Sequence, residues 1–357
     1  LGFEAGETTT GSKNIAIGYQ SLSQNTGAYN SGDDNIAIGS GTLWNITTSS
    51  ENIAIGTYAG YGTTTGVKNT YIGRRAGYSD QTSSLNTYLG YNAGYSCTRE
   101  ENTAVGAQSM EYTSGLKNTF LGLNAGRGNS SQTNGLASNN TGVGSFSLNV
   151  LNGGSGNTCF GDSSGSSITT GSDNTLIGKD MGGVTTGSKN LFLGVDAGSV
   201  NSPSGAITTG SNNIVLGGNT IDNLYCADTS ISSSDKRDKT DITDFTHGLK
   251  WVEQLKPVTY RWDKRTWYNE YNEDGSLKTE VTPDGSKKRA RQHIGFLAQD
   301  VLAIEQADGY ASKKDDMLVV NLNEDDTAYG LQYERSVPVL VNAIKELSAK
   351  VTALEAK

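Results

Sequence analysis

The stretch NTYIGRRAGYSDQTSSLNTYLGYNAGYS, residues 69–96, contains two nearly identical copies of one unit, 17 residues apart. Each copy begins with Asn-x-x-(Ile/Leu/Val/Phe)-Gly and continues into Ala-Gly. The five-residue motif occurs twelve times, at intervals of 16 to 23 residues, beginning at Asn14, Asn35, Asn52, Asn69, Asn86, Asn102, Asn118, Asn140, Asn157, Asn174, Asn190 and Asn213. A short, nearly constant repeat of this kind is typical of stacked, solenoid-like folds.

The chemistry of one unit predicts a short strand followed by a tight turn. In the motif that begins at Asn14, Ile15 and Ile17 alternate with a small residue and therefore point to one face of the strand. Asn and Gly at its ends tolerate the positive φ values of turns. A single unit buries only two or three side chains, but stacked units merge their apolar positions into a continuous column. We therefore predict a mainly β repeat: a β-solenoid or interwoven β-prism, with longer loops where the interval reaches 21–23 residues.

The coils are thin, and three chains side by side would supply burial that one chain lacks. The predicted shaft is therefore trimeric.

Charge is distributed unevenly along the 357 residues. Residues 1–233 contain 9 Lys/Arg and 15 Asp/Glu, whereas residues 234–357 contain 19 and 22. This change predicts a repeat shaft at 1–225, a junction at 226–233 and a globular C-terminal domain at 234–357.

Several function classes are disfavoured by composition. The net charge of −9 argues against a general nucleic-acid binder. Cys97, Cys159 and Cys226 have neither metal-site spacing nor an evident disulfide pattern, so we predict no metal and no cofactor. No apolar run approaches the length of a transmembrane helix, which argues against membrane insertion. The repeats contain few acids, so no glycosidase site is predicted there.

The C-terminal segment has the pattern of a small α+β domain. Leu249, Val252 and Leu255 have helical spacing that ends before Pro257, and residues 258–262 alternate as a strand. Two Asp-Gly turns in residues 272–289 predict an exposed hairpin or long loop. A second helix follows residues 293–297, and residues 317–323 form another apolar strand.

The final helix has apolar residues spaced 3, 4, 3, 4 and 3 apart. They are Val337, Leu340, Ile344, Leu347, Val351 and Leu354. This spacing predicts the seam of a trimeric coiled coil. The alternative is a terminal helix packed on its own domain.

The repeats resemble the head repeats of trimeric autotransporter adhesins and the Asn-Thr-x-x-Gly arrays of phage tail fibres. This resemblance implies an elongated trimeric surface fibre. Tyrosines of the repeats are candidates for packing or for stacking on sugar rings, namely Tyr19, Tyr58, Tyr71, Tyr78, Tyr88 and Tyr91.

The C-terminal segment resembles the self-cleaving intramolecular chaperone domain of phage tailspikes and tail fibres, the endosialidase type (peptidase S74). The motifs that carry the resemblance are SDKRDK at 234–239, LKPVTYRW at 255–262, HIGFLAQDV at 293–301 and YERSVPVLVNAIKEL at 333–347. The resemblance implies a domain that trimerises, nucleates folding of the preceding fibre and then releases itself.

The resemblance also implies which residues make the cut. Ser234 is the nucleophile, attacking the carbonyl of Ser233, and Lys239 is the base of a Ser-Lys dyad. Lys236 and Arg237 supply like charge that would lower the pKa of this lysine. Supporting positions are Asp235, Arg237, His293 and Gln299.

Two observations temper this assignment. By composition alone, SSSDKRDK would be a solvated linker. Residues five apart also lie on opposite faces of a strand and well apart on a helix. The dyad therefore needs a turn, or a lysine from a neighbouring chain.

The resulting hypothesis is a homotrimeric phage tail fibre, located in the virion tail, that binds a glycan or protein receptor on the host surface. Its single enzymatic activity is one self-directed cut. The alternative is a bacterial trimeric surface adhesin with the same terminal domain.

Overall fold

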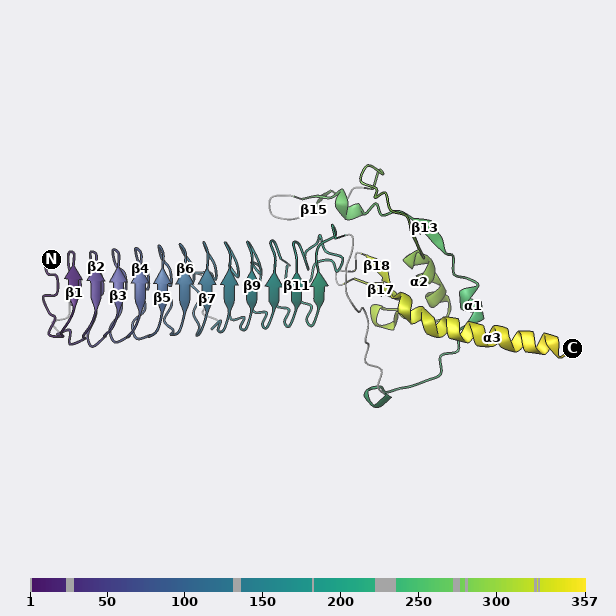
Figure 1. Cartoon of the computed structure of the whole chain (residues 1–357), viewed down its shortest axis with the longest axis horizontal. Helices are drawn as coiled ribbons and strands as arrows, with labels where there is room; N and C mark the ends of the chain where they lie inside the picture. Colours follow the sequence, from purple (N-terminus) through teal and green to yellow (C-terminus); the bar gives the residue numbers. More distant parts are fainter. Residues whose placement is uncertain are drawn as a thin grey trace. The chain divides into compact units, whose positions relative to one another are not determined.

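The computed structural model describes residues 2–23, 29–130, 136–181, 183–221, 236–271, 277–279, 282–323, 326 and 328–357. The chain divides into two compact units, Leu1–Gly218 and Asn219–Lys357. The first is a parallel β-solenoid, and the second is a small α+β unit ending in a helix (Figure 1).

The solenoid contributes one three-residue strand per coil to a single twelve-stranded parallel sheet (Figure 1). The strands are β1 (Ile15–Ile17), β2 (Ile36–Ile38), β3 (Ile53–Ile55), β4 (Thr70–Ile72), β5 (Thr87–Leu89), β6 (Thr103–Val105), β7 (Thr119–Leu121), β8 (Thr141–Val143), β9 (Thr158–Phe160), β10 (Thr175–Ile177), β11 (Leu191–Leu193) and β12 (Ile214–Leu216). Each strand pairs with the next coil of the same chain, so the architecture is the β-solenoid and not the interwoven prism.

The motif asparagines form a continuous ladder inside the coils. The side-chain Oδ1 of each one accepts the backbone N–H of the next, at 2.8–3.1 Å throughout. The amide nitrogen donates to a turn carbonyl, as Asn52 does to the Gly66 carbonyl at 3.1 Å. An amide side chain both donates and accepts, so every rung satisfies buried polar groups of its neighbour.

The asparagine ladder reverses our prediction about which strand residues fill the interior. Because Asn faces inward to reach the turn carbonyls, alternation turns the third motif residue inward and the second and fourth outward. Tyr71, Tyr88 and Phe120, at the third position, are fully buried, whereas Ile15 and Ile17 are exposed. Side chains from the turns, such as Leu43, complete an interior that one chain fills by itself. Further chains are therefore not needed to fill the coil.

The glycine that ends each strand is required by a close backbone approach. Gly106 has a φ of +130°, and a Cβ there would lie 2.4 Å from the Gly122 carbonyl oxygen. Any side chain would push the coils apart at this point.

Longer intervals leave the strand register unchanged. Ile15 pairs with Ile36, Thr119 with Thr141 and Leu191 with Ile214, across intervals of 21, 22 and 23 residues. The additional residues lie between strands, as predicted. Residues 24–28 and 131–135 of the first two long coils are outside the described residues.

Two buried carboxyl groups lie among the described residues of the solenoid, Asp80 and Glu111. Asp80 accepts hydrogen bonds from the Tyr71 hydroxyl at 2.8 Å, the Asn86 amide at 2.9 Å and the Ser83 backbone N–H at 3.2 Å. Burial nevertheless raises the pKa of this carboxyl to about 6, from an ordinary value of 3.8.

This raised pKa predicts a pH-dependent stability of the shaft. The folded state binds the Asp80 proton more tightly than the unfolded chain, so stability should rise as the pH falls from about 7 to about 4, by up to ~3 kcal/mol. Asp80→Asn should flatten the dependence of the unfolding free energy on pH. Asp173→Asn, which changes an exposed carboxyl, should leave that dependence unchanged. Denaturant unfolding at several pH values measures both slopes. Equal slopes for wild type and Asp80→Asn would contradict the assignment.

The C-terminal unit contains three two-stranded antiparallel pairs and three α-helices among its described residues. The pairs are β13 (Val258–Tyr260) with β16 (His293–Gly295), β14 (Glu270–Tyr271) with β15 (Leu277–Thr279), and β17 (Val320–Leu322) with β18 (Tyr329–Leu331). The helices are α1 (Leu249–Val252), α2 (Ala298–Ala307) and α3 (Val337–Glu355). Short 3-10 turns are η1 (Lys236–Asp238), η2 (Arg265–Trp267), η3 (Lys314–Asp316) and η4 (Tyr333–Ser336).

The long helix α3 packs on the rest of its unit by a face different from the predicted seam. Val339 and Ala343 are buried, and the Asn342 amide donates to the Phe245 carbonyl at 2.6 Å. All six seam residues remain exposed, from 44% at Leu340 to 69% at Leu354. The helix therefore packs on its own domain while leaving the heptad face open, and the coiled coil remains a prediction.

Candidate functional site

The predicted cleavage junction lies at the edge of the described structure. Ser233, Ser234 and Asp235 are outside the described residues. The turn η1 begins directly afterwards, and the Lys239 backbone N–H donates to the Lys236 carbonyl at 3.3 Å. Lys236, Arg237 and Lys239 are all exposed.

His293 lies on β16, opposite Tyr260 of β13. Its ring stacks on that of Tyr260, with centroids 5.5 Å apart and planes 19° apart, and meets the edge of Trp262 at 6.3 Å. Gln299 is exposed in the first turn of α2. His293 is thus held by aromatic rings.

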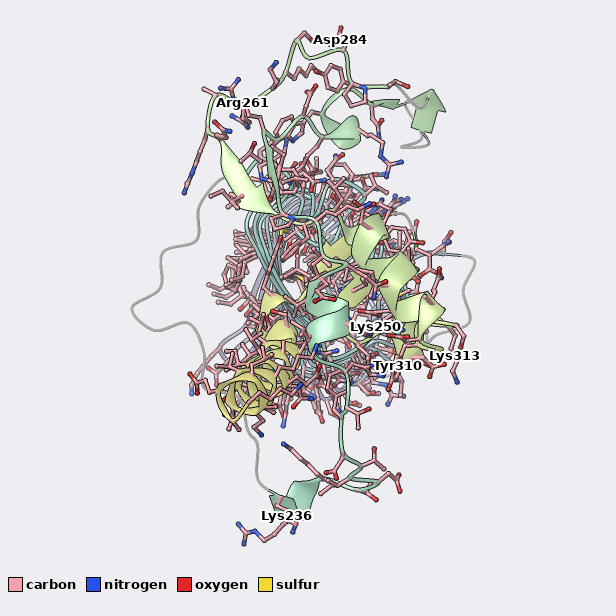
Figure 2. The ribbon with its side chains drawn as sticks, turned by 90° about the vertical axis from the view of Figure 1, so that its right-hand side faces the viewer. Lys236, Lys250, Arg261, Asp284, Tyr310 and Lys313 are labelled. Atoms are coloured by element: carbon pink, nitrogen blue, oxygen red, sulfur yellow. The ribbon has the colours of Figure 1, made fainter. Side chains whose placement is uncertain are left out.

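The predicted site residues that the structure describes, Lys239, His293 and Gln299 among them, are not gathered at one place in the single chain. Figure 2 shows Lys236, beside the predicted base, and Arg261, beside the strand pair that holds His293, at opposite ends of the view. Any convergence of Lys239 with His293 would require another chain or another arrangement of the junction.

A basic and aromatic group surrounds η2, and the sequence analysis did not single it out. Lys264 Nζ lies 5.1 Å from the Trp262 ring centroid, and the Arg289 guanidinium lies 4.9 Å from that of Trp267. These cation–π contacts hold the segment around residue 289 against η2.

Sequence analysis also missed a buried carboxylate that joins α2 to β17. Glu305 is fully buried, and its oxygens accept backbone N–H groups of Leu318, Val319 and Val320 at 3.0, 2.7 and 3.0 Å. An acid in a helix ordinarily faces solvent, so nothing in the residue pattern marks it. Its role is to satisfy the start of a strand.

A third group that the sequence analysis missed surrounds Trp251 in α1. The His247 ring stacks on Trp251 with centroids 5.2 Å apart, and its Nδ1 lies 3.4 Å from Asp308 Oδ2. The same carboxylate accepts the Trp251 indole N–H. His247 therefore helps to pack α1. Beside it lies an apolar cavity of about 70 Å³, lined in part by Trp251, Val339 and Leu340.

Several of the shaft tyrosines proposed for sugar stacking are packed against other groups, whereas Tyr19 stays 52% exposed beside Phe3. Tyr71 and Tyr88 are buried. Tyr78 is stacked between Tyr61 and Tyr95, with centroid distances of 5.0 and 5.1 Å. Tyr58 and Tyr91 are exposed, but Arg74 lies over the Tyr91 ring at 5.7 Å. Most of these rings therefore serve packing.

Residues 234–310 match the family model described as chaperone of endosialidase, Peptidase_S74. This part of the chain is similar to the chaperone of endosialidase family. The match begins at Ser234 and includes Lys239, His293 and Gln299. The last predicted motif of the chaperone domain, at 333–347, lies beyond the matched segment. No curated protein and no solved structure shows a significant match to the chain.

The remaining site predictions concern absences. Among the described residues, no group of three or more His, Cys, Asp or Glu side chains is placed to hold a metal ion. Cys97 and Cys159 are buried free thiols, and burial raises their pKa values to about 11 and about 12. No helix in the described part of the chain is long and apolar enough to cross a membrane.

Proposed function

We propose that this chain is a trimeric phage tail fibre whose C-terminal domain assists trimer assembly and then releases itself between Ser233 and Ser234. The observation that carries the proposal is the position of the family match. It begins at Ser234, the predicted nucleophile, after a shaft whose last strand ends at Leu216.

The trimer is supported by the family of the chaperone domain and by α3. Six apolar side chains at heptad spacing face solvent in one chain. A helix of 19 residues with such an exposed seam is suited to bundle with its copies. Association would bury this seam and favour parallel alignment of the three chains.

The proposed cut is an acyl transfer followed by hydrolysis. The Ser234 hydroxyl oxygen bonds to the Ser233 carbonyl carbon, the peptide C–N bond breaks, and the Ser234 nitrogen takes a proton. Water then hydrolyses the ester, giving a carboxylate on Ser233 and regenerating the hydroxyl. Lys239 would accept the hydroxyl proton in the first step.

The position of Lys239 favours a contribution from a second chain. A lysine acts as a base when burial or nearby positive charge disfavours its charged form. Lys239 is exposed in one chain, so its burial would come from a neighbour in the trimer. Cleavage would then follow correct assembly.

The test is expression of the full chain, followed by a denaturing gel, mass analysis and light scattering. We expect two pieces, the smaller of which begins at Ser234, and a shaft with the mass of three copies. A folded wild-type chain that stays uncut would contradict the proposed autoproteolysis. A monomeric shaft would contradict the proposed trimer. Binding of the purified shaft to cells of candidate host bacteria tests its role as a receptor-binding fibre.

A further inference from the structure

The outward face of the solenoid sheet carries an unbroken apolar column. The last residue of every strand, which is the fourth residue of the motif, faces outward and is apolar in all twelve coils. These residues, which we call the apolar stripe, are Ile17, Ile38, Ile55, Ile72, Leu89, Val105, Leu121, Val143, Phe160, Ile177, Leu193 and Leu216. Leu89, Phe160 and Ile177 are between 42% and 45% exposed, although neighbours in the stripe cover them above and below.

The stripe is too long to be an accident of composition. Twelve rungs at the spacing of hydrogen-bonded strands span about 50 Å. No rung carries a charge. The first residue of each strand forms a second column beside the stripe, and this column is also uncharged. It contains isoleucine in β1–β3, threonine in β4–β10, leucine in β11 and isoleucine in β12. Continuous exposed apolar surface of this kind marks an interaction site.

Six of the charges that border this face are paired within the chain. Just before the motif asparagines, Lys13 lies 3.8 Å from Asp34, Lys68 lies 4.0 Å from Glu51, and Lys117 lies 3.7 Å from Glu101. These exposed pairs add little stability. Their consequence is that an identical chain meets a border of mixed and partly paired charges instead of a row of like charges.

We propose that the apolar stripe is the surface through which the shafts of three copies pack, parallel and in register. The inference rests on the trimer proposed above and assigns its contact face. A second copy is the occupant because the stripe repeats at every rung. A partner without the same repeat would lose its match within a few coils, whereas a copy matches along the whole length.

The contact face is tested by cross-linking in the full chain, with Cys226→Ser as background because Cys97 and Cys159 are buried. Leu121→Cys places one thiol in the stripe, and Thr65→Cys places one on an exposed turn. With a short bis-maleimide, we expect most Leu121→Cys chains to cross-link, and Thr65→Cys chains to remain single. Light scattering first establishes whether the protein is a trimer.

The outcomes separate the two proposals. A trimer in which Leu121→Cys does not cross-link overturns the contact face and leaves the trimer standing. A monomeric protein overturns both.

A charge in the stripe gives an independent test. The Leu121→Lys variant should be monomeric at concentrations where the wild type is trimeric. Its circular dichroism spectrum should match that of the wild type, because the side chain faces outward and the fold of the single chain is unchanged. The control is Leu85→Lys, at a leucine that is 54% exposed against 38% for Leu121, in the column where another coil carries Lys68. If Leu121→Lys stays trimeric and as stable as the control, the proposal fails.

Discussion

The Ser234→Ala variant is expected to yield one uncut chain where the wild type yields two pieces. Alanine has no oxygen to attack the Ser233 carbonyl, so the acyl transfer cannot begin. Lys239→Met should slow the cut by roughly 10²- to 10⁴-fold, the usual contribution of a positioned base. A denaturing gel and mass analysis over time after synthesis measure both effects.

The matched control is Ser232→Ala, which removes a neighbouring hydroxyl from the same run of serines. It should be cut like the wild type. If Ser234→Ala is still cut at the same bond, or Ser232→Ala alone is uncut, the nucleophile has been misassigned. Mixed trimers of Ser234→Ala and Lys239→Met chains address the second question. Restored cleavage in the mixture would show that the two residues act across chains.

The second large effect is expected from Asn118→Ala in the middle of the asparagine ladder. The side chain of Asn118 accepts the Asn140 backbone N–H at 3.0 Å and donates to the Ala137 carbonyl at 2.8 Å and to Asn102 Oδ1 at 3.1 Å. Alanine leaves the Asn140 N–H and the Ala137 carbonyl without this partner, whereas Asn102 Oδ1 keeps the Asn118 backbone N–H at 2.9 Å. At about 1–3 kcal/mol for each of the two unsatisfied groups, the loss is roughly 2–6 kcal/mol of unfolding free energy.

Denaturant unfolding of the shaft measures this loss. The control is Asn139→Gly, next to the ladder, where the residue is exposed and has a φ of +59° that glycine adopts easily. It should change stability by well under half as much. If both variants unfold at the same denaturant concentration, the ladder is not a main source of stability.

The repeat period located every strand of the solenoid, but it did not determine which way the strands face. An alternating strand has two possible orientations, and shifting by one residue exchanges inside and outside. The deciding fact is three-dimensional, because the amide of a residue such as Asn52 must reach a carbonyl in the next coil. The pair of isoleucines in Asn-Ile-Ala-Ile-Gly suggested the opposite orientation, since exposed isoleucine is unexpected in one isolated chain.

In the C-terminal unit, local patterns predicted α2, α3 and β13, and the family motifs placed Ser234 at the start of the matched segment. Long-range polar contacts could not be read in the same way. Glu305 is an ordinary helical acid until β17 lies beside it, and Asp308 is a loop residue until Trp251 and His247 meet it. Such contacts depend on residues far apart in the chain, and residue spacing carries no record of them.

The unequal coil lengths have a practical consequence. Strands on either side of the 23-residue interval still pair Leu191 with Ile214 in the same register as strands 16 residues apart. The scaffold therefore accepts insertions at its turns without loss of alignment, and these turns are places where foreign peptides can be displayed at fixed, nanometre-scale intervals. In an evolving lineage, the same tolerance lets the connecting loops diversify while the strand register of the solenoid is kept.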